Sequence, residues 1–316
     1  IWRLFRVPLD AAALQRWGAP YLHIHRADYI AVLAKALRQA DPETLRLGAE
    51  VRDYRQTETS VTVRLADGST FSGDVLIGAD GIHSIIRTQM LGPEAPRFTG
   101  NVAWRVVVPV DQLGEHAPDP TACVWMGKRR HGVTYRLRRG TLANFVGVVK
   151  RTDWTSEAWT ERGNKADALA DFAGWHPTIQ TLLEAGSEFY RWALFDRPPL
   201  PRWVDGSAAL LGDAAHPMLP FMAQGAAMAV EDGWVLARAL SSELTMAQGL
   251  NRYQAARLDR TAKVQAVSRD NATTFHKSTP LSQLATYGPM WLAGRFAPAL
   301  IRQRQDWLYG YDVCAF

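Results

Sequence analysis

A glycine, an aspartate and a helix start rich in small residues follow one another in the segment 210–232. Gly212 ends an apolar run and permits a sharp bend, so the Asp213 carboxylate points off the end of a predicted strand. A long helix is predicted from Gly225, and small residues in its first turns leave the N–H groups approachable. The segment can therefore bind hydroxyl groups and face an electron-rich ligand. The alternative is a structural aspartate that caps a helix.

A second glycine-rich turn follows the predicted buried strand 75–77. Asp80 and Gly81 lie in this turn, and a helix is predicted over 84–90. Turns of this kind accept phosphates or ribose hydroxyls at the start of the helix. Packing at a strand end is the alternative interpretation.

His131 and Tyr135 are four residues apart in a predicted strand, so both side chains lie on one face of it. The alternative to a functional pair is a histidine satisfied in the core beside a buried tyrosine. His23 and His25 also share a face of an alternating segment. Without a further ligand nearby, the pattern indicates packed or exposed histidines and no metal site.

The elements that position these residues alternate between short strands and helices. Strands are predicted at 2–8, 45–47, 50–56, 60–65, 101–110, 121–126, 132–137, 141–149, 189–195 and 208–211. Helices are predicted from about 28 through Leu37, at 166–172 and 177–185, and at 250–271, the last with Tyr253, Ala256, Val264 and Val267 inward; 153–163 is a predicted loop. The strands between 100 and 150 favour a mixed or antiparallel sheet.

Composition excludes several functional classes. The chain has 316 residues, 47% of them hydrophobic, and a formal net charge of +5, which is typical of a globular protein. Its basic residues are scattered apart from short clusters such as 128–130, so we expect no nucleic-acid partner and favour a basic pocket for small anionic substrates. Two cysteines and no apolar run of membrane length predict a cytoplasmic protein without a membrane partner.

Segment 212–217, with the helix start at 224–226, resembles the second FAD motif of the single-component flavoprotein aromatic hydroxylases. Segment 74–84 is similar to a second motif of that family, and 144–231 resembles its salicylate hydroxylase-like branch nearly throughout. The resemblance implies an α/β (α+β) fold, in which a Rossmann-like FAD-binding domain carries an inserted mixed β-sheet for substrate. It also implies FAD as cofactor and NADH or NADPH as co-substrate.

The resemblance divides the chain into four parts. Residues 1–98 are expected to form a partial FAD-binding domain with strand contributions to the substrate domain, and residues 99–200 the substrate-binding sheet. Residues 201–275 return to the FAD-binding domain, and 276–316 form a helical tail that docks onto the body. A homodimer is compatible with this reading.

Site roles are carried over from the family by position. The expected FAD contacts are Arg26, Val51, Asp80, Gly81, Asp213, Pro220, Gly225 and Ala226. The expected substrate contacts are His131, Tyr135, Met218, Pro220 and Met222, and the catalytic candidates are His131, Tyr135 and, ranked below them, His216.

The resemblance implies that the reduced FAD reacts with O2 to give a 4a-hydroperoxyflavin, whose terminal oxygen is transferred to a small phenolic or hydroxy-heteroaromatic carboxylic acid. A phenol with a pKa of about 10 needs a base or hydrogen-bond acceptor nearby. No Gly-x-Gly-x-x-Gly occurs in the sequence, although the family carries one in its first βαβ unit. We therefore expect that this unit is missing either from the sequence given or from the protein itself, and the start at Ile1 favours an incomplete sequence. The alternative function is a non-catalytic remnant or small-molecule-binding protein unable to hold FAD.

Overall fold

The structure is a computed structural model that describes residues 3–151, 153 and 161–316, so the predicted loop 153–163 lies partly outside the described residues. The fold is a mixed α/β fold, as predicted. Contacts group the chain into two compact units. The first, which we call the sheet unit, comprises Ile1–Ala40, Phe98–Leu194 and Thr273–Tyr311. The second, the motif unit, comprises Asp41–Arg97, Phe195–Ala272 and Asp312–Phe316.

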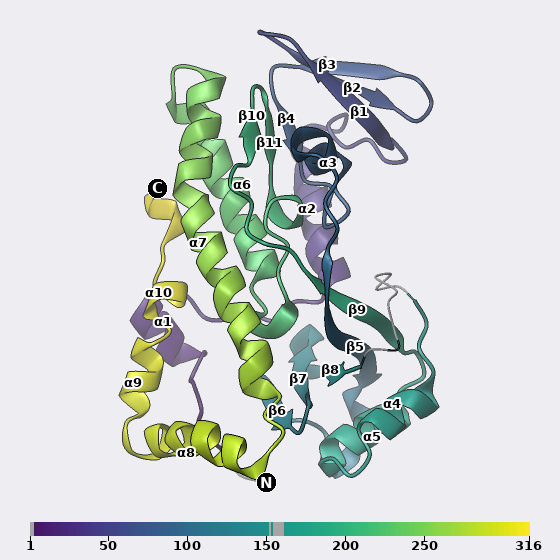
Figure 1. The fold of residues 1–316 in the computed structure, drawn as a ribbon, viewed down its shortest axis with the longest axis vertical. Coiled ribbons are helices and arrows are strands. Elements are labelled where there is room, and N and C mark those ends of the chain that lie inside the picture. The colour runs from purple at the N-terminus through teal and green to yellow at the C-terminus, as the bar shows by residue number, and fades with distance from the viewer. Residues whose placement is uncertain (1–2, 152, 154–160) are drawn as a thin grey trace. The chain divides into compact units, whose positions relative to one another are not determined.

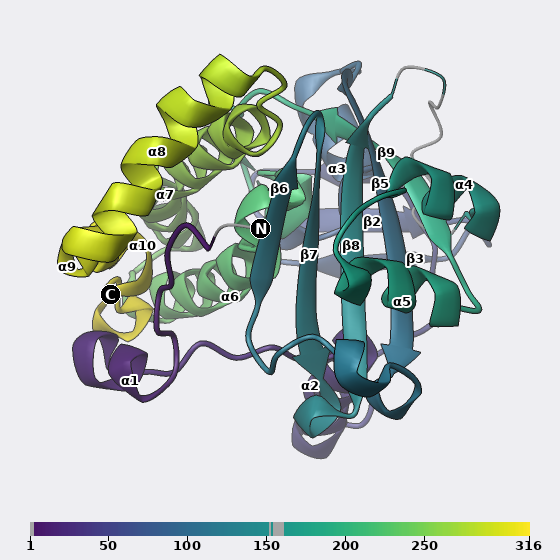
Figure 2. The same ribbon diagram turned by 90° about the horizontal axis from the view of Figure 1, so that it is seen from below.

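A five-stranded sheet is the centre of the sheet unit within the described residues. Its strand order is β6 (Cys123–Gly127), β7 (Arg130–Leu137), β8 (Leu142–Lys150), β5 (Arg97–Pro109) and β9 (Tyr190–Asp196). The pairs β6·β7, β7·β8 and β8·β5 are antiparallel, which confirms the predicted sheet. Figure 2 shows the strands side by side, with α4 (Lys165–Asp171) and α5 (Pro177–Ala185) against one face.

Successive side chains along β5 point to the two faces of this sheet in turn. Val102, Trp104, Val106 and Val108 are buried and belong to one apolar core together with Phe145, Phe172 and Leu182. Side chains at the intervening positions of β5 point to the opposite face. The sheet is therefore fixed by hydrophobic packing on one side and can present polar groups on the other.

The N-terminal segment differs from its prediction. The described residues 3–9 form no strand, and neither does 21–25; instead α1 (Ala11–Trp17) begins after Asp10, whose carboxylate accepts a hydrogen bond from the Ala12 N–H. The alternating residues have no strand to pair with, and the Tyr21 ring packs edge-on against Tyr309. α2 (Arg26–Ala40) confirms the predicted helix.

The tail forms α8 (Pro280–Phe296), α9 (Pro298–Gln303) and α10 (Asp306–Tyr309). α10 lies beside α1 (Figure 1), where Arg16 and the indole N–H of Trp17 both donate to the Asp306 carboxylate. The predicted docking of the tail is thus confirmed within the sheet unit.

Two small sheets belong to the motif unit. One has the order β10 (Val204–Asp205), β11 (Ala208–Leu210), β4 (Leu76–Gly78), and the other comprises β1 (Val51–Gln56), β2 (Val61–Leu65) and β3 (Thr70–Gly73). The predicted strand at 45–47 is wrong, since these residues pair with no strand among those described. The helices are α3 (Ile85–Leu91), α6 (Gly225–Ser242) and α7 (Met246–Phe275), which runs on into the sheet unit.

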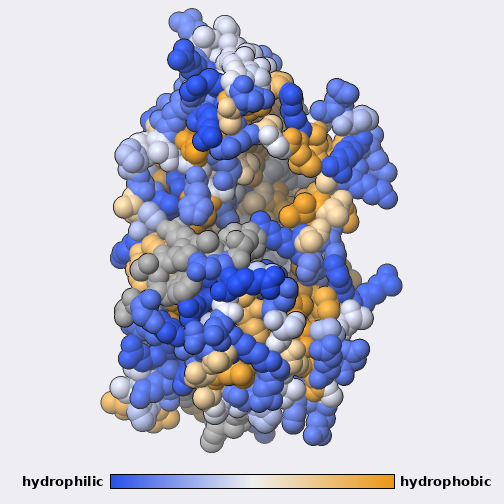
Figure 3. Space-filling view, turned by 90° about the vertical axis from the view of Figure 1, so that its right-hand side faces the viewer, coloured by the Kyte–Doolittle hydropathy of each residue, from blue (hydrophilic) through white to orange (hydrophobic). Residues whose placement is uncertain are grey.

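Short 3-10 turns complete the regular structure: η1 (Val110–Gln112), η2 (Gly114–His116), η3 (Arg138–Gly140), η4 (Gly212–Ala214), η5 (Pro220–Met222) and η6 (Val313–Ala315). Hydrophilic side chains predominate on the face seen in Figure 3, and apolar ones gather there in smaller patches. Among the described residues, no helix has both the length and the hydropathy needed to cross a bilayer.

Adding one methyl group should distinguish a tightly packed glycine from an open one. A Cβ on Gly147 would overlap the rings of Phe172 and Phe145, so Gly147→Ala should destabilise the protein by about 1–3 kcal/mol through overpacking. Gly233 lies within α6 with no described atom near a Cβ, so Gly233→Ala should stabilise by about 0.5–1 kcal/mol. Urea unfolding measures both variants. Equal effects of the two changes would contradict the packing described for the sheet.

Candidate functional site

The two glycine–aspartate turns meet at one edge of the sheet β10-β11-β4. β4 and β11 are parallel neighbours, with Ala209 opposite Ile77, so their carboxyl ends lie at the same edge. Asp80 and Gly81 follow β4, and Gly212 and Asp213 follow β11. The φ of Gly212 is +62°, which a side chain would disfavour. Two motifs separated by more than a hundred residues are thus brought to one edge of the sheet.

Arg87 connects the two turns through hydrogen bonds to a backbone carbonyl in each. The side chain is buried, and its guanidinium donates to the carbonyl oxygens of Ile82 at 2.6 Å and Ala214 at 3.0 Å. Asp80 accepts from the N–H groups of Ile85 at 2.9 Å and Ile86 at 3.2 Å, and so caps α3. The arginine fixes the spacing of the turns, and Asp80 fixes the helix that carries the arginine.

His216 lies in the core and not at the exposed edge where Asp213 lies. It is 1% exposed, and its Nε2 is 2.5 Å from Asp232 Oδ2. Asp232 also accepts from Gly212 N–H at 3.1 Å and from Arg257 Nε at 2.8 Å. Burial alone would raise the pKa of Asp232, but His216 and Arg257 outweigh it and hold that pKa below its usual value. His216 therefore occupies a packing position in the core of the motif unit.

A polar stripe on α7 holds the segment between the turn and α6. Gln265 donates to the carbonyl of Pro217 at 2.8 Å, and Ser268 to that of Leu219 at 2.6 Å. Asn271 donates to the Phe221 carbonyl at 3.2 Å. The sequence pattern predicted only Tyr253, Ala256, Val264 and Val267 on the inner face of α7. Polar residues at helical spacing beside that apolar face were the signal that could have revealed the stripe.

The start of α6 lies beside the Asp213 carboxylate. Asp213 and Ala226 are exposed, and a Cβ on Gly225 would lie 3.9 Å from Asp213 Oδ1 and 3.6 Å from Met218 Cγ. The side chain of Gln224, the N-cap residue of this helix, makes no capping hydrogen bond. Pro220 is exposed and Met222 half-buried in the same segment. A carboxylate, a helix N-terminus and the Met218 side chain are therefore close together in the motif unit.

Val51 and Arg26, two further predicted FAD contacts, lie in neither glycine–aspartate turn. Val51 opens β1, in the second small sheet, and its side chain packs against the core of the motif unit. Arg26 is the exposed first residue of α2 in the sheet unit. Two residues later, Asp28 forms an ion pair with Arg138 at 2.7 Å.

Polar side chains gather on the face of the five-stranded sheet opposite its apolar core. Tyr135 on β7 is opposite Asn144 on β8, and Arg105 on β5 donates to Asn144 Oδ1 at 3.3 Å. Burial raises the pKa of Tyr135, and Arg105 opposes this effect. Asn144 is fully buried, and its amide nitrogen has no hydrogen-bond partner in the described part of the chain. Sequence reasoning missed Arg105, although a charge at an alternating position of an apolar strand was a usable signal.

His131 lies on the same face and contacts a second histidine. Its Nδ1 is 2.7 Å from Nε2 of His276, while Tyr135 stacks on His23 with ring centroids 4.9 Å apart. Burial and His276 lower the pKa of His131 to about 3. Burial and Lys150 lower the pKa of His276 to about 4. No local pattern pointed to His276, which is 145 residues from its partner.

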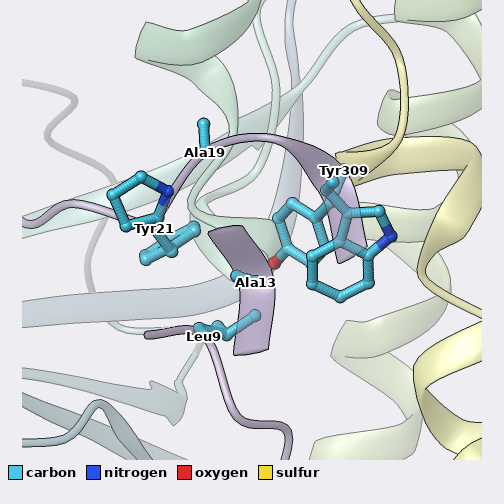
Figure 4. A pocket seen from close by; sticks show the side chains of 7 residues that line it. Leu9, Ala13, Ala19, Tyr21 and Tyr309 are labelled. Atoms are coloured by element: carbon cyan, nitrogen blue, oxygen red, sulfur yellow. The ribbon is translucent and has the colours of Figure 1, made fainter. Parts of the chain in front are cut away.

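Two cavities open in the sheet unit. The first, of about 120 Å³, is aromatic: Tyr21 and Tyr309 line it beside Leu9, Ala13 and Ala19 (Figure 4). The second, of about 180 Å³, is lined by Lys128, Arg129, Arg130, Lys150 and Arg151, with Asp171. The cluster 128–130 thus contributes to a basic pocket. Among the described residues, no group of histidine, cysteine and carboxylate side chains could hold a metal ion.

Comparison with known proteins gives consistent matches along the chain. A model of the family described as "FAD binding domain" matches residues 7–268. The 6-hydroxynicotinate 3-monooxygenase of Pseudomonas fluorescens is 37% identical over 98% of this chain and 74% of that protein. A salicylate hydroxylase substrate complex is 32% identical, with a TM-score of 0.76 over 92% of this chain and 74% of that one. HpxO of Klebsiella pneumoniae, solved with FAD and uric acid, is 28% identical, with a TM-score of 0.82 over 95% of this chain and 76% of that one.

The paired histidines should make stability depend on pH. Both have folded-state pKa values below the ordinary 6.5, so below that pH the unfolded chain binds protons that the folded chain does not. Stability should be highest above pH 6.5 and fall toward pH 4, by up to about 1.4 kcal/mol per pH unit for each histidine. The double variant His131→Asn/His276→Asn should show a shallower fall in urea unfolding at pH 4.5–7.

The control is His116→Asn, which changes an exposed histidine in the same unit. It should leave the pH dependence as in the wild type. An unchanged slope in the double variant would show that these two histidines do not cause the acid sensitivity.

Proposed function

Because the chain belongs to the FAD binding domain family, it is an FAD-dependent aromatic monooxygenase, and we propose a small phenolic or hydroxy-heteroaromatic carboxylic acid as its substrate. Two similar proteins are named for 6-hydroxynicotinate and salicylate, both of them ring-hydroxylated aromatic acids. The observation that carries the proposal is the cluster of Arg105, Asn144, Tyr135 and His131 on one sheet face. A cation, an unpaired amide donor and an imidazole suit a carboxylate and a ring hydroxyl.

The motif unit has residues that fit FAD. We propose that the exposed Asp213 carboxylate binds hydroxyls of its ribityl chain, and that the N–H groups at Gly225 and Ala226 face the pyrimidine end of its ring system. Arg26, Val51, Asp80, Gly81 and Pro220 are the further proposed contacts. When bound, FAD supplies the activation of O2 at the expense of NADH or NADPH.

We propose that the polar sheet face orients the substrate. Arg105 pairs with the carboxylate, the Asn144 amide donates to a substrate oxygen, and Tyr135 contacts the ring. His131 Nε2 accepts the proton of the ring hydroxyl, which makes the ring more electron-rich. Met218, Pro220 and Met222 of the motif unit are further proposed substrate contacts, and their apolar side chains would exclude water. His216 positions the turn that carries Asp213.

Cofactor binding and turnover test the function directly. Purified protein titrated with FAD should bind it and become yellow, and the FAD-loaded protein should oxidise NADH or NADPH faster when a hydroxylated aromatic acid is added. Salicylate, 3-hydroxybenzoate and 6-hydroxynicotinate are the probes, and mass spectrometry should find a product that carries one more oxygen atom. Protein that takes up no FAD, or yields no hydroxylated product, would support the non-catalytic binding protein instead.

Replacing Arg105 should impair recognition of the carboxylate. Hydrogen bonds to a charged group contribute about 1.5–3 kcal/mol, so Arg105→Met should raise KM for the best acid about 10- to 100-fold. The matched phenol that lacks the carboxylate should show no such loss. Arg139→Met changes an exposed arginine of the same unit and serves as control. Equal losses for the acid and the plain phenol would reject the assigned contact.

A further inference from the structure

The contact between His131 and His276 connects a buried ring to the surface of the sheet unit. His131 is 1% exposed, whereas His276 is half-buried and directly follows α7. The two rings lie with centroids 5.0 Å apart, and the Phe275 ring packs edge-on against His131. The 2.7 Å separation of Nδ1 and Nε2 is the length of a strong hydrogen bond.

Helix α8 fixes the segment that carries His276. The Tyr287 hydroxyl donates to the Thr274 carbonyl at 3.1 Å, and Gln283 donates to the Lys277 carbonyl at 3.0 Å. These bonds hold the backbone on both sides of His276. The position of the ring therefore follows from the fold of the tail.

A hydrogen bond between two neutral imidazoles needs one protonated and one unprotonated nitrogen, so the tautomers of the two rings are coupled. If His131 Nδ1 carries the proton and donates to His276 Nε2, then His131 Nε2 keeps its lone pair. In the reverse arrangement, His131 Nε2 carries a proton and cannot accept another. The tautomer of His276 therefore decides whether His131 can act as a base.

We propose that His276 is a positioning residue that keeps His131 in its Nδ1–H tautomer and takes over the proton that His131 removes from the substrate hydroxyl. This inference rests on the proposed function. The ring O–H bond breaks as its proton binds His131 Nε2, and the Nδ1 proton of His131 passes to His276 Nε2. His276 Nδ1 then releases a proton to water, so the histidine pair is neutral with both Nε2 atoms protonated. The starting tautomers return when the same transfers run in reverse, as His131 Nε2 gives its proton back to the oxygen of the hydroxylated product and His276 Nδ1 takes a proton from water.

Burial makes such a transfer necessary. His131, with a pKa near 3, cannot keep a second proton at neutral pH, because its surroundings do not solvate an imidazolium. His276 is closer to solvent, and Lys150 of β8 lowers its pKa, which favours onward release of the proton. Lys277, the next residue in the chain, adds a further positive charge near this exit.

Two substitutions separate transfer from simple positioning. In His276→Gln, the amide can still hydrogen-bond to His131 Nδ1 but cannot pass a proton on; His276→Phe removes both capacities. With the FAD-loaded protein, kcat should fall at least 10-fold in His276→Gln while KM changes less than 3-fold. The kcat of His276→Phe should be lower still. His116→Gln is the control and should match the wild type.

A bound chromogenic probe reports proton removal without turnover. A nitrophenol carboxylic acid absorbs in the visible range when its hydroxyl is ionised. The pH midpoint of that ionisation in the complex should rise by at least one unit in His276→Phe relative to the wild type. Circular dichroism checks that both variants are folded.

The outcomes distinguish this inference from the proposed function. Wild-type hydroxylation with kcat and ionisation midpoint unchanged in both variants would overturn the relay alone, and full rescue of kcat by glutamine would reduce His276 to a structural contact. If the wild type neither binds nor hydroxylates aromatic acids, the proposed function fails, and ¹⁵N NMR of labelled histidines then tests the pair. A His131 protonated at Nε2 and not at Nδ1 would overturn the positioning role.

Discussion

The buried Asp232 carboxylate is the interaction on which the geometry of the motif unit depends. It is fully buried, and a charge in that position is tolerated only because His216, Arg257 and the Gly212 N–H all donate to it. These donors come from the turn after β11 and from α7, while Asp232 itself lies on α6. One anion thereby fixes the distance between the turn that presents Asp213 and the helix start that faces it. Arg87 extends the same constraint to the turn after β4.

In the sheet unit, hydrophobic packing and not a buried ion pair fixes the positions of the polar side chains. Strand alternation places Trp104 and Phe145 in one apolar core, where Gly147 leaves room for the Phe172 ring. Because that core fixes the strands, the opposite face can hold polar groups that do not stabilise the fold themselves. The unpaired amide nitrogen of Asn144 costs free energy in this state. A bound ligand that accepts from it would recover that cost.

The sequence correctly predicted those elements that depend on interactions between residues close together in the chain. The strands between 101 and 149, helix α5 and the turn at Gly212 follow from alternation, helix capping and glycine geometry. The strands expected at 2–8, among their described residues, and at 45–47 failed because apolar content does not supply a neighbouring strand. Arg105 and His276 were missed because their roles arise from contacts between distant segments. The burial of His216 depends on Asp232, the last residue of the segment 210–232, for which the sequence pattern predicted no role.

His131 and His216 were both catalytic candidates in the sequence, with His216 ranked lower, and their hydrogen-bond partners now distinguish them. His216 hydrogen-bonds to the Asp232 carboxylate, to which Arg257 also donates, so the role of His216 in this network is structural. The partner of His131 is another imidazole ring, which has one nitrogen that can accept a hydrogen bond and one that can donate. A base in a dry site needs a partner that passes its proton on, and the half-buried His276 is the more exposed ring of this pair. The pairing of one imidazole with another is therefore the reason for which we propose His131, and not His216, as the base.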